Sequence, residues 1–127
     1  MSLDITPVTP EGRQVIQKYG GGGFKIAGLA FKSSVLVRAE KTIVWPLVEA
    51  SEITLDSLEP VLEGDADSGI LLIGCGPRFI APPKRLRQAL KDRGVALEWM
   101  DTGAACRTFN VLLTEERLAV AALIAVD

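Results

Sequence analysis

An uninterrupted apolar run at residues 69–75 constrains the fold of this chain more than any other feature. The run contains Ile70, Leu71, Leu72 and Ile73, and it is too short for a typical helix. A strand that is apolar on both faces must be covered on both faces, as happens in parallel sheets. The run therefore predicts a central strand in an α/β sheet.

The segments after this run predict a parallel crossover. Leu86, Ala89 and Leu90 are spaced for the apolar face of a helix, and Gly94 is placed to end that helix. Residues 95–100 predict a second strand. Because strand, helix and strand follow one another, we expect the two strands to be parallel with a right-handed connection.

Two more helices are expected to flank these strands. The first covers residues 54–63, where Thr54 is placed as the N-cap and Pro60 marks a helix start or a kink. The second covers residues 103–114. Residues 117–126 stay open between helix and strand, because their alanines favour a helix whereas their Val and Ile residues favour a strand.

The first half of the chain predicts an antiparallel meander. We expect a short helix or an ordered turn at residues 11–19, ended by the four flexible glycines of residues 20–23, because glycine opposes regular structure. Residues 24–28 and 34–37 predict paired strands. A third strand at residues 42–45 stops at a proline, which cannot donate to a sheet ladder.

Composition indicates one globular domain with a substantial core. The 127 residues are 48% hydrophobic and 24% charged, a balance that argues against disorder. We expect a single domain over residues 1–127, with an irregular start or a short helix at 1–18 and the core at 19–126. No linker, repeat or low-complexity segment is apparent.

Charge and residue content exclude several classes of function. A net charge of -2 lacks the broad basic surface of a nucleic-acid binder, although a local patch at Lys84, Arg85 and Arg87 stays open. The absence of histidine removes Ser-His-Asp and Cys-His mechanisms and the commonest zinc ligand. The two cysteines cannot form a four-thiolate metal site and lack Cys-x-x-Cys spacing. We therefore expect no metal, no cofactor, no nucleic-acid partner and two buried free thiols.

Targeting and membrane-spanning signals are not recognisable in the sequence. Residues 1–10 carry Asp4, two prolines and no positive charge, unlike a secretory signal or an Arg-rich transit peptide. The longest apolar run, residues 118–126, is less than half the ~20 residues of a transmembrane helix. We expect a cytoplasmic protein without a membrane span.

The glycine turn Gly74-Cys75-Gly76, at the end of the central apolar run, offers one candidate binding site. A dinucleotide fingerprint needs a third glycine where Phe79 stands, and a methyltransferase-like loop needs one at Arg78. A structural tight turn is therefore favoured over nucleotide binding. Because no partner base is recognisable for Cys75, a buried thiol is favoured over a nucleophile.

Polar residues at the start of the last helix offer a second candidate site. Asp101 and Thr102 follow a strand and can cap the helix, which is the structural interpretation. In the functional interpretation, Asp101, Arg107 and Asn110 line a site at the end of the sheet, where open α/β folds bind ligands. Arg107 and Asn110 share one polar face of the helix, and an ordinary solvated face is the competing explanation.

Four motifs along the chain recur together in one known family. They are Tyr19 with the following glycines and Phe24; Ser34-Val35-Leu36-Val37 followed by Trp45; Ile73-Gly74-x-Gly76 with Pro82 or Pro83 after it; and Met100-Asp101-Thr102 with Ala105, Arg107, Thr108, Asn110, Leu112, Glu115 and Arg117. From Tyr19 to Ile124 the chain resembles a small, uncharacterised α/β domain family of prokaryotes. Its animal relatives include a mitochondrial respiratory complex I assembly factor and an adipogenesis-associated protein. Cys75 departs from the family, which often has Thr or Ser there, and Ser33 stands where a glycine is usual.

The resemblance implies both a fold and a role. It implies a single three-layer α/β domain with antiparallel N-terminal strands and a central mixed sheet flanked by helices, in which residues 117–126 form a last strand antiparallel to its neighbours. Because the family has no established catalytic residues, the resemblance supports a non-enzymatic accessory protein that assists assembly of a respiratory or other membrane-associated complex. Its protein partner would be recognised through Asp101, Arg107 and Asn110. The alternative is a small-molecule-binding protein or enzyme with a cleft between Gly74-Cys75-Gly76 and the Arg107/Asn110 helix.

Overall fold

Two sheets and three α-helices make up the part of the chain described by the computed structural model, residues 13–63 and 69–127. The small antiparallel sheet contains β1 (Ile16–Gly20), β2 (Gly23–Ile26) and β3 (Leu29–Phe31). The large sheet contains β4 (Ser34–Val37), β5 (Thr42–Trp45), β6 (Ile70–Gly74), β7 (Ala96–Met100) and β8 (Ala119–Leu123), in the order β5-β4-β8-β6-β7. The helices are α1 (Leu55–Leu62), α2 (Lys84–Asp92) and α3 (Thr102–Thr114), with a short 3-10 turn, η1 (Ala50–Glu52), before α1.

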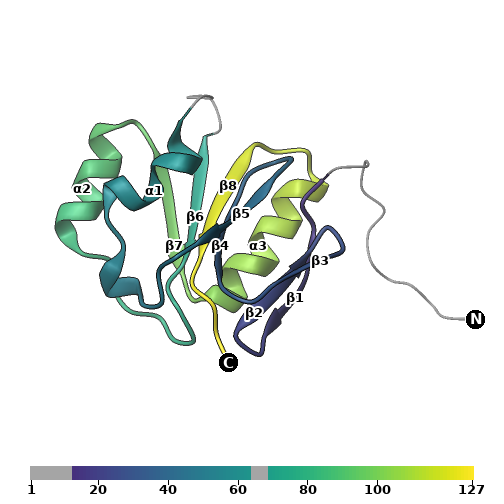
Figure 1. Ribbon diagram of the computed structural model, residues 1–127. Helices are drawn as coiled ribbons and strands as arrows, with labels where there is room; N and C mark the ends of the chain where they lie inside the picture. The colour runs from purple at the N-terminus through teal and green to yellow at the C-terminus, as the bar shows by residue number, and fades with distance from the viewer. Residues whose placement is uncertain (1–12, 64–68) are drawn as a thin grey trace, which may run out of the picture.

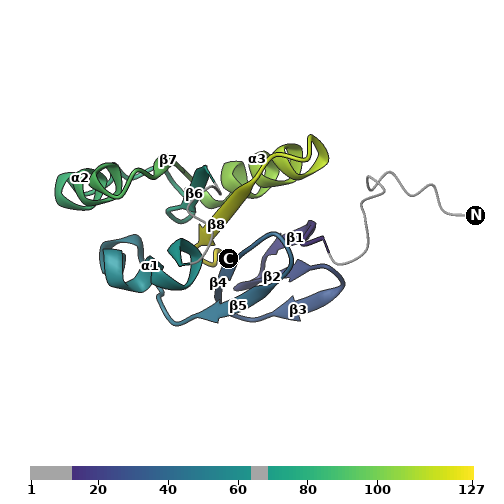
Figure 2. The ribbon, with the colours of Figure 1, turned by 90° about the horizontal axis from the view of Figure 1, so that it is seen from above.

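The large sheet is the middle layer of three, as expected. Helices α1 and α2 cover one face, and α3 together with the small sheet covers the other (Figures 1 and 2). Strand β6 shows why its sequence is apolar throughout: Leu71 and Ile73 pack toward α1 and α2, whereas Leu72 packs toward α3. The predicted central strand and its parallel crossover through α2 to β7 are confirmed.

Strand β8 lies in the centre of the large sheet and is buried along its whole length. It is antiparallel to β4, with Leu36 opposite Ala122, but parallel to β6, with Leu72 opposite Ala121. The expectation that the last strand is antiparallel to its neighbours is therefore correct on one side and wrong on the other. The physical reason is that β8 follows the α3 crossover from β7, which returns the chain in the direction of β6 and β7.

The N-terminal segment forms a strand where a short helix or turn was expected. Within residues 11–19, positions 11 and 12 lie outside the described residues, and β1 begins at Ile16. The four glycines do not end regular structure: Gly20 and Gly23 pair with each other, and only the two glycines between them form the turn of a hairpin. Both turn glycines have positive φ, 62° and 84°, which glycine adopts without strain.

The pairing predicted for the first half of the chain is also corrected. Strand β2 pairs with β1 and β3, whereas β4 pairs with β5 and β8, so the two strands predicted as partners lie in different sheets. Strand β3 was not predicted, because its three residues are mostly exposed and carry no alternating pattern. The strand at residues 42–45 and its end before Pro46 are confirmed.

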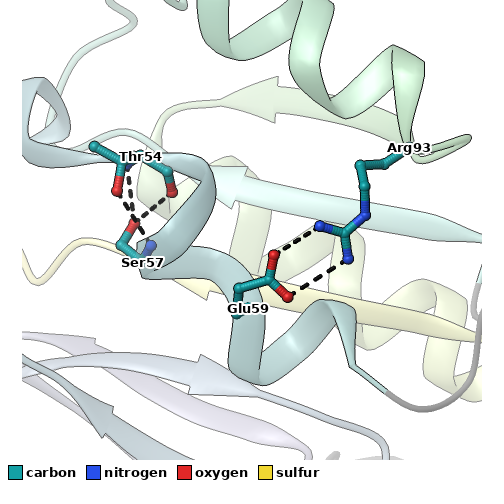
Figure 3. Close-up of polar contacts among 4 residues, drawn as sticks. All are labelled: Thr54, Ser57, Glu59 and Arg93. Atoms are coloured by element: carbon teal, nitrogen blue, oxygen red, sulfur yellow. Dashed lines mark hydrogen bonds and ion pairs between the residues drawn. The ribbon is translucent and has the colours of Figure 1, made fainter.

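Helix α1 is capped at its start and is joined at the surface to the residue that follows α2 (Figure 3). Thr54 caps α1 as predicted: its hydroxyl accepts from the Ser57 amide at 3.1 Å, and its own amide donates to the Ser57 hydroxyl at 3.0 Å. The helix begins before Pro60 and continues through it, so the proline does not mark its start. The guanidinium of Arg93, just after α2, donates to the Glu59 carboxylate at 2.6 Å.

Candidate functional site

The residues at the start of α3 hold the ends of three strands together. The Asp101 carboxylate accepts from the Ala104 amide at 2.9 Å, which confirms it as the N-cap. The buried Thr102 hydroxyl donates to the Ile124 carbonyl at 2.7 Å and accepts from the Gly76 amide at 3.0 Å. Both side chains therefore have structural partners.

Open α/β sheets bind ligands in a crevice at one end of the sheet, and in this fold the glycine turn and the start of α3 meet at that end. Such a crevice lies at the carboxyl ends of neighbouring strands whose helices leave on opposite faces, here β6 and β7. The Cys75 amide donates to the Met100 carbonyl at 2.8 Å, and the Thr102 amide donates to the Gly76 carbonyl at 2.9 Å. A Cβ on Gly74 would lie 2.8 Å from the Thr102 Cα, so the turn and α3 are in direct contact. The start of α3 therefore contacts the glycine turn directly, where the sequence predicted a cleft between the turn and the Arg107/Asn110 helix.

The polar face of α3 docks the small sheet. The Asn110 side-chain oxygen accepts from the Ile16 amide and its nitrogen donates to the Ile16 carbonyl, both at 2.9 Å. The Arg107 guanidinium donates to the Tyr19 hydroxyl at 2.7 Å. Thus β1 covers much of the helix face for which the sequence left solvent and ligand as alternatives. Within residues 13–63 and 69–127, no hydrogen bond or ion pair joins Asp101 to Arg107 or Asn110.

A cleft of about 460 Å³ opens on the other side of the glycine turn. Its walls come from the segment before α1, the loop between β6 and α2, strand β7 and the chain after β8. The lining residues are Val48, Glu49, Ala50, Ser51, Cys75, Gly76, Pro77, Ile80, Ala81, Pro83, Trp99, Ile124 and Ala125. Of the residues predicted for binding, this cleft includes Cys75 and Gly76, and none of its lining residues belongs to α3.

The Cys75 thiol fixes the loop that forms one wall of the cleft. The thiol is buried, donates to the Arg78 carbonyl and accepts from the Ile80 amide, each at 3.4 Å. The Trp99 indole nitrogen donates to the Ile80 carbonyl from the floor. A serine or threonine hydroxyl at this position could donate and accept in the same way.

The opposite wall is fixed by a carboxylate. The Glu52 side chain accepts from the amides of Val48 and Glu49, at 2.9 and 2.8 Å. These two hydrogen bonds lower the pKa of the Glu52 carboxyl below its ordinary value, because they favour the charged form. Both walls therefore hold their shape through side chain to backbone hydrogen bonds.

The mouth of the cleft exposes apolar side chains. Val48 is 73% exposed and Ile80 57%, and Phe79, next to Ile80 in the loop, is 61% exposed. The lining functional groups are the Glu49 carboxylate, the Ser51 hydroxyl and the Cys75 thiol, and the thiol is already hydrogen-bonded. This arrangement suits a ligand or a partner that presents apolar groups to the cleft. Sequence analysis missed Val48, Phe79 and Ile80, although two adjacent apolar residues in a proline-bounded loop were a usable signal.

The second cysteine belongs to the core. Burial raises the pKa of the Cys106 thiol to about 12, with Arg107 lowering it and Asp101 raising it by smaller amounts. Both cysteines are unpaired and buried, as expected from their spacing. The described residues hold no group of three or more His, Cys, Asp or Glu side chains suited to a metal ion. No helix among them is long and apolar enough to cross a membrane.

Comparison with known proteins places these features in a family. The family model described as "Protein of unknown function (DUF498/DUF598)" matches residues 16–124. The chain is 36% identical to the zebrafish (Danio rerio) NADH dehydrogenase [ubiquinone] 1 alpha subcomplex assembly factor 3, covering 97% of this chain and 71% of the relative. It is 34% identical to the human protein of the same name, covering 86% of this chain and 59% of the relative.

The fold also matches a solved structure closely. The crystal structure described as an outer membrane protein from Bartonella henselae has a TM-score of 0.82 and 36% sequence identity, covering 92% of this chain and 98% of that one. The matched family segment runs from the first residue of β1 to the residue after β8, and so contains both sheets and all the helices described above. The chain therefore belongs to the DUF498/DUF598 family.

Proposed function

We propose that this chain is a non-enzymatic accessory protein that assists assembly of a respiratory membrane complex by binding a protein partner. The observation that carries the proposal is the similarity to two animal proteins named as NADH dehydrogenase assembly factors, over 97% and 86% of this chain. The chain spans only 59% of the human relative. The proposed role is therefore assigned to the domain that this chain shares with its relatives.

The cleft supports a binding role. Its apolar mouth, at Val48 and Ile80, exposes side chains that gain free energy when a partner covers them. Among the residues predicted for binding, we assign Cys75 and Gly76 to this site. Arg107 is exposed beside Tyr19 and stays a candidate for a second contact, whereas both polar atoms of the Asn110 side chain are used within the fold.

A small-molecule ligand is the second candidate. The cleft volume of about 460 Å³ lies within the range of roughly 300–1,000 Å³ that is common for small-molecule sites. The ligand would contact Trp99 and the glycine turn at the carboxyl ends of three parallel strands, β6, β7 and β8. An apolar metabolite that shifts the Trp99 fluorescence and saturates would favour this function over a protein partner.

Deletion of the gene in the native cell tests the proposed function. We expect less fully assembled NADH dehydrogenase on native gels, with recovery when the gene is restored, and co-purification of complex subunits with the tagged protein. Fractionation should find the protein in the cytoplasm. Normal amounts of assembled respiratory complexes in the deletion strain would refute the proposal.

A further inference from the structure

A basic segment lies beside the apolar cleft. Residues 78–91 contain five cationic side chains and no acidic one, in a chain whose net charge is -2. Arg78 follows the lining residue Pro77, Lys84 and Arg85 follow the lining residue Pro83, and all three cations are exposed. The one ion pair among the described residues joins Arg93 to Glu59, so these three cations have no carboxylate partner within the described fold. The α2 end of the cleft is therefore free to attract an anion.

The cleft continues into a second hollow of about 350 Å³. Val48 and Ala125 line both, so the two hollows meet at these side chains. The second hollow extends to Gly22, Lys32 and Ser33 on the small-sheet side. We call the two hollows together the Val48 groove. An elongated groove of this kind suits an extended chain better than a compact metabolite.

We propose that the Val48 groove binds an extended segment of a protein partner, in which apolar side chains enter the groove and carboxylates follow toward Arg78, Lys84 and Arg85. The proposal rests on the proposed function in taking the occupant to be a protein. The direction follows from charge: Lys32 and Asp127, which have opposite charges, both line the far hollow, whereas three cations without a carboxylate partner in the described fold lie at the α2 end.

The two acidic side chains of the groove limit where carboxylates can bind. Glu49 lines the first hollow, so an acidic side chain there would meet a like charge. The segment must therefore be apolar through the groove and acidic only beyond Ile80. Exposed apolar side chains beside cations are also found on membrane-binding surfaces, so lipid vesicles form one arm of the test.

Selection from a phage-displayed library of random twelve-residue peptides tests the proposal. We expect enriched sequences that share two or three apolar positions followed by Asp or Glu. A synthetic fluorescein-labelled copy of the most enriched peptide should bind the purified protein with an affinity that falls as salt rises. No enrichment, or enrichment of sequences without acidic residues, overturns the proposal.

Paired variants locate the peptide. Val48→Glu should weaken binding of the labelled peptide by roughly tenfold or more, because it places a charge in the apolar mouth. Val111→Glu is the matched control: Val111 is 56% exposed on α3, outside the groove, and its replacement should leave the affinity unchanged. Equal losses in both variants, or no loss in either, contradict the groove as the site.

A charge reversal tests the contribution of the acidic part of the peptide separately from that of its apolar part. Arg78→Glu with Arg85→Glu should reduce affinity by roughly tenfold for the acidic peptide and little for a peptide with the acids replaced by amides. Arg117→Glu, at an exposed position after α3, is the control. Loss of affinity for both peptides alike would refute the assigned direction.

Vesicles provide the remaining arm of the experiment. The protein should not sediment with vesicles of phosphatidylglycerol and phosphatidylcholine. Sedimentation that Phe79→Ser abolishes would identify a membrane surface as the occupant and overturn the peptide proposal. A deletion strain with impaired assembly but no peptide binding by the purified protein would retain the proposed function and refute this inference alone.

Discussion

Replacement of Asn110 by alanine should destabilise the fold by about 2–4 kcal/mol, because it removes two hydrogen bonds and leaves two backbone groups unsatisfied beneath α3. The amide of Asn110 holds both the N–H and the C=O of Ile16, at 2.9 Å each. Ile16 is only 5% exposed and begins the strand of the small sheet that packs against α3. Both backbone groups lose the side-chain partner that the fold provides, so the loss should exceed that of an ordinary surface substitution.

Urea unfolding followed by tryptophan fluorescence measures this loss, with Arg107→Ala as the control. Arg107 donates to the hydroxyl of Tyr19, a residue that is 42% exposed, so water can replace the bond and the expected change is within about 0.5 kcal/mol. Asn110→Asp keeps an acceptor for the Ile16 amide but turns a carboxylate oxygen toward the Ile16 carbonyl oxygen, so it should destabilise the fold at least as much as Asn110→Ala. Hydrogen exchange at the Ile16 amide should accelerate in Asn110→Ala. A loss below about 0.5 kcal/mol with unchanged exchange would refute the docking role of Asn110.

Three further predictions concern backbone space, thiol reactivity and a surface ion pair. A Cβ on Gly23 would lie 2.0 Å from a backbone oxygen of β3, so Gly23→Ala should cost more than about 3 kcal/mol by urea unfolding; a loss below 1 kcal/mol would contradict this close approach. Burial raises the pKa of the Cys106 thiol to about 12, so only about one part in ten thousand of it is thiolate at pH 8. Iodoacetamide should therefore modify Cys106 only after the protein unfolds, and rapid labelling of Cys106 in the native protein would refute this prediction. The hydrogen bond from Arg93 lowers the pKa of the Glu59 carboxyl in the folded state, so this ion pair should stabilise the fold above the unfolded-state pKa and lose that effect as pH falls through the folded-state pKa. Glu59→Gln should remove this part of the dependence of stability on pH, and an unchanged pH profile of stability in the variant would contradict the prediction.

The elements that could be predicted from the sequence are those with a local sequence pattern, such as an apolar run or a helix cap. The run from Ile70 to Ile73 identifies a doubly covered strand, and Asp101 and Thr54 cap the helices that follow them. Strand β1 gave no such signal, because only Ile16, at one end, is buried, and the strand packs against α3, which is distant in sequence. Local pattern also could not place β8 between one parallel and one antiparallel neighbour, since that depends on the crossover through α3.

The site was harder to predict because its parts are distant in sequence. A polar face at Arg107 and Asn110 has the same sequence pattern whether it meets water, a ligand or a strand 94 residues away. The cleft is lined by four separate segments, so no single motif describes it. Only the glycine turn at Cys75 and Gly76 was found in advance, because a turn after a buried strand marks the end of a sheet.

The two sides of the glycine turn have different consequences for binding. On the α3 side, the hydrogen bonds of Thr102 and Asn110 use the polar groups internally, so substitutions there act first on stability. On the α1 and α2 side, Glu52 and the Cys75 thiol fix the two walls of the cleft while Val48 and Ile80 remain exposed. A groove whose backbone is held before binding loses little conformational entropy when a partner enters. Substitution of its exposed side chains therefore changes affinity with little effect on folding, which makes this side the one where recognition can be measured separately from stability.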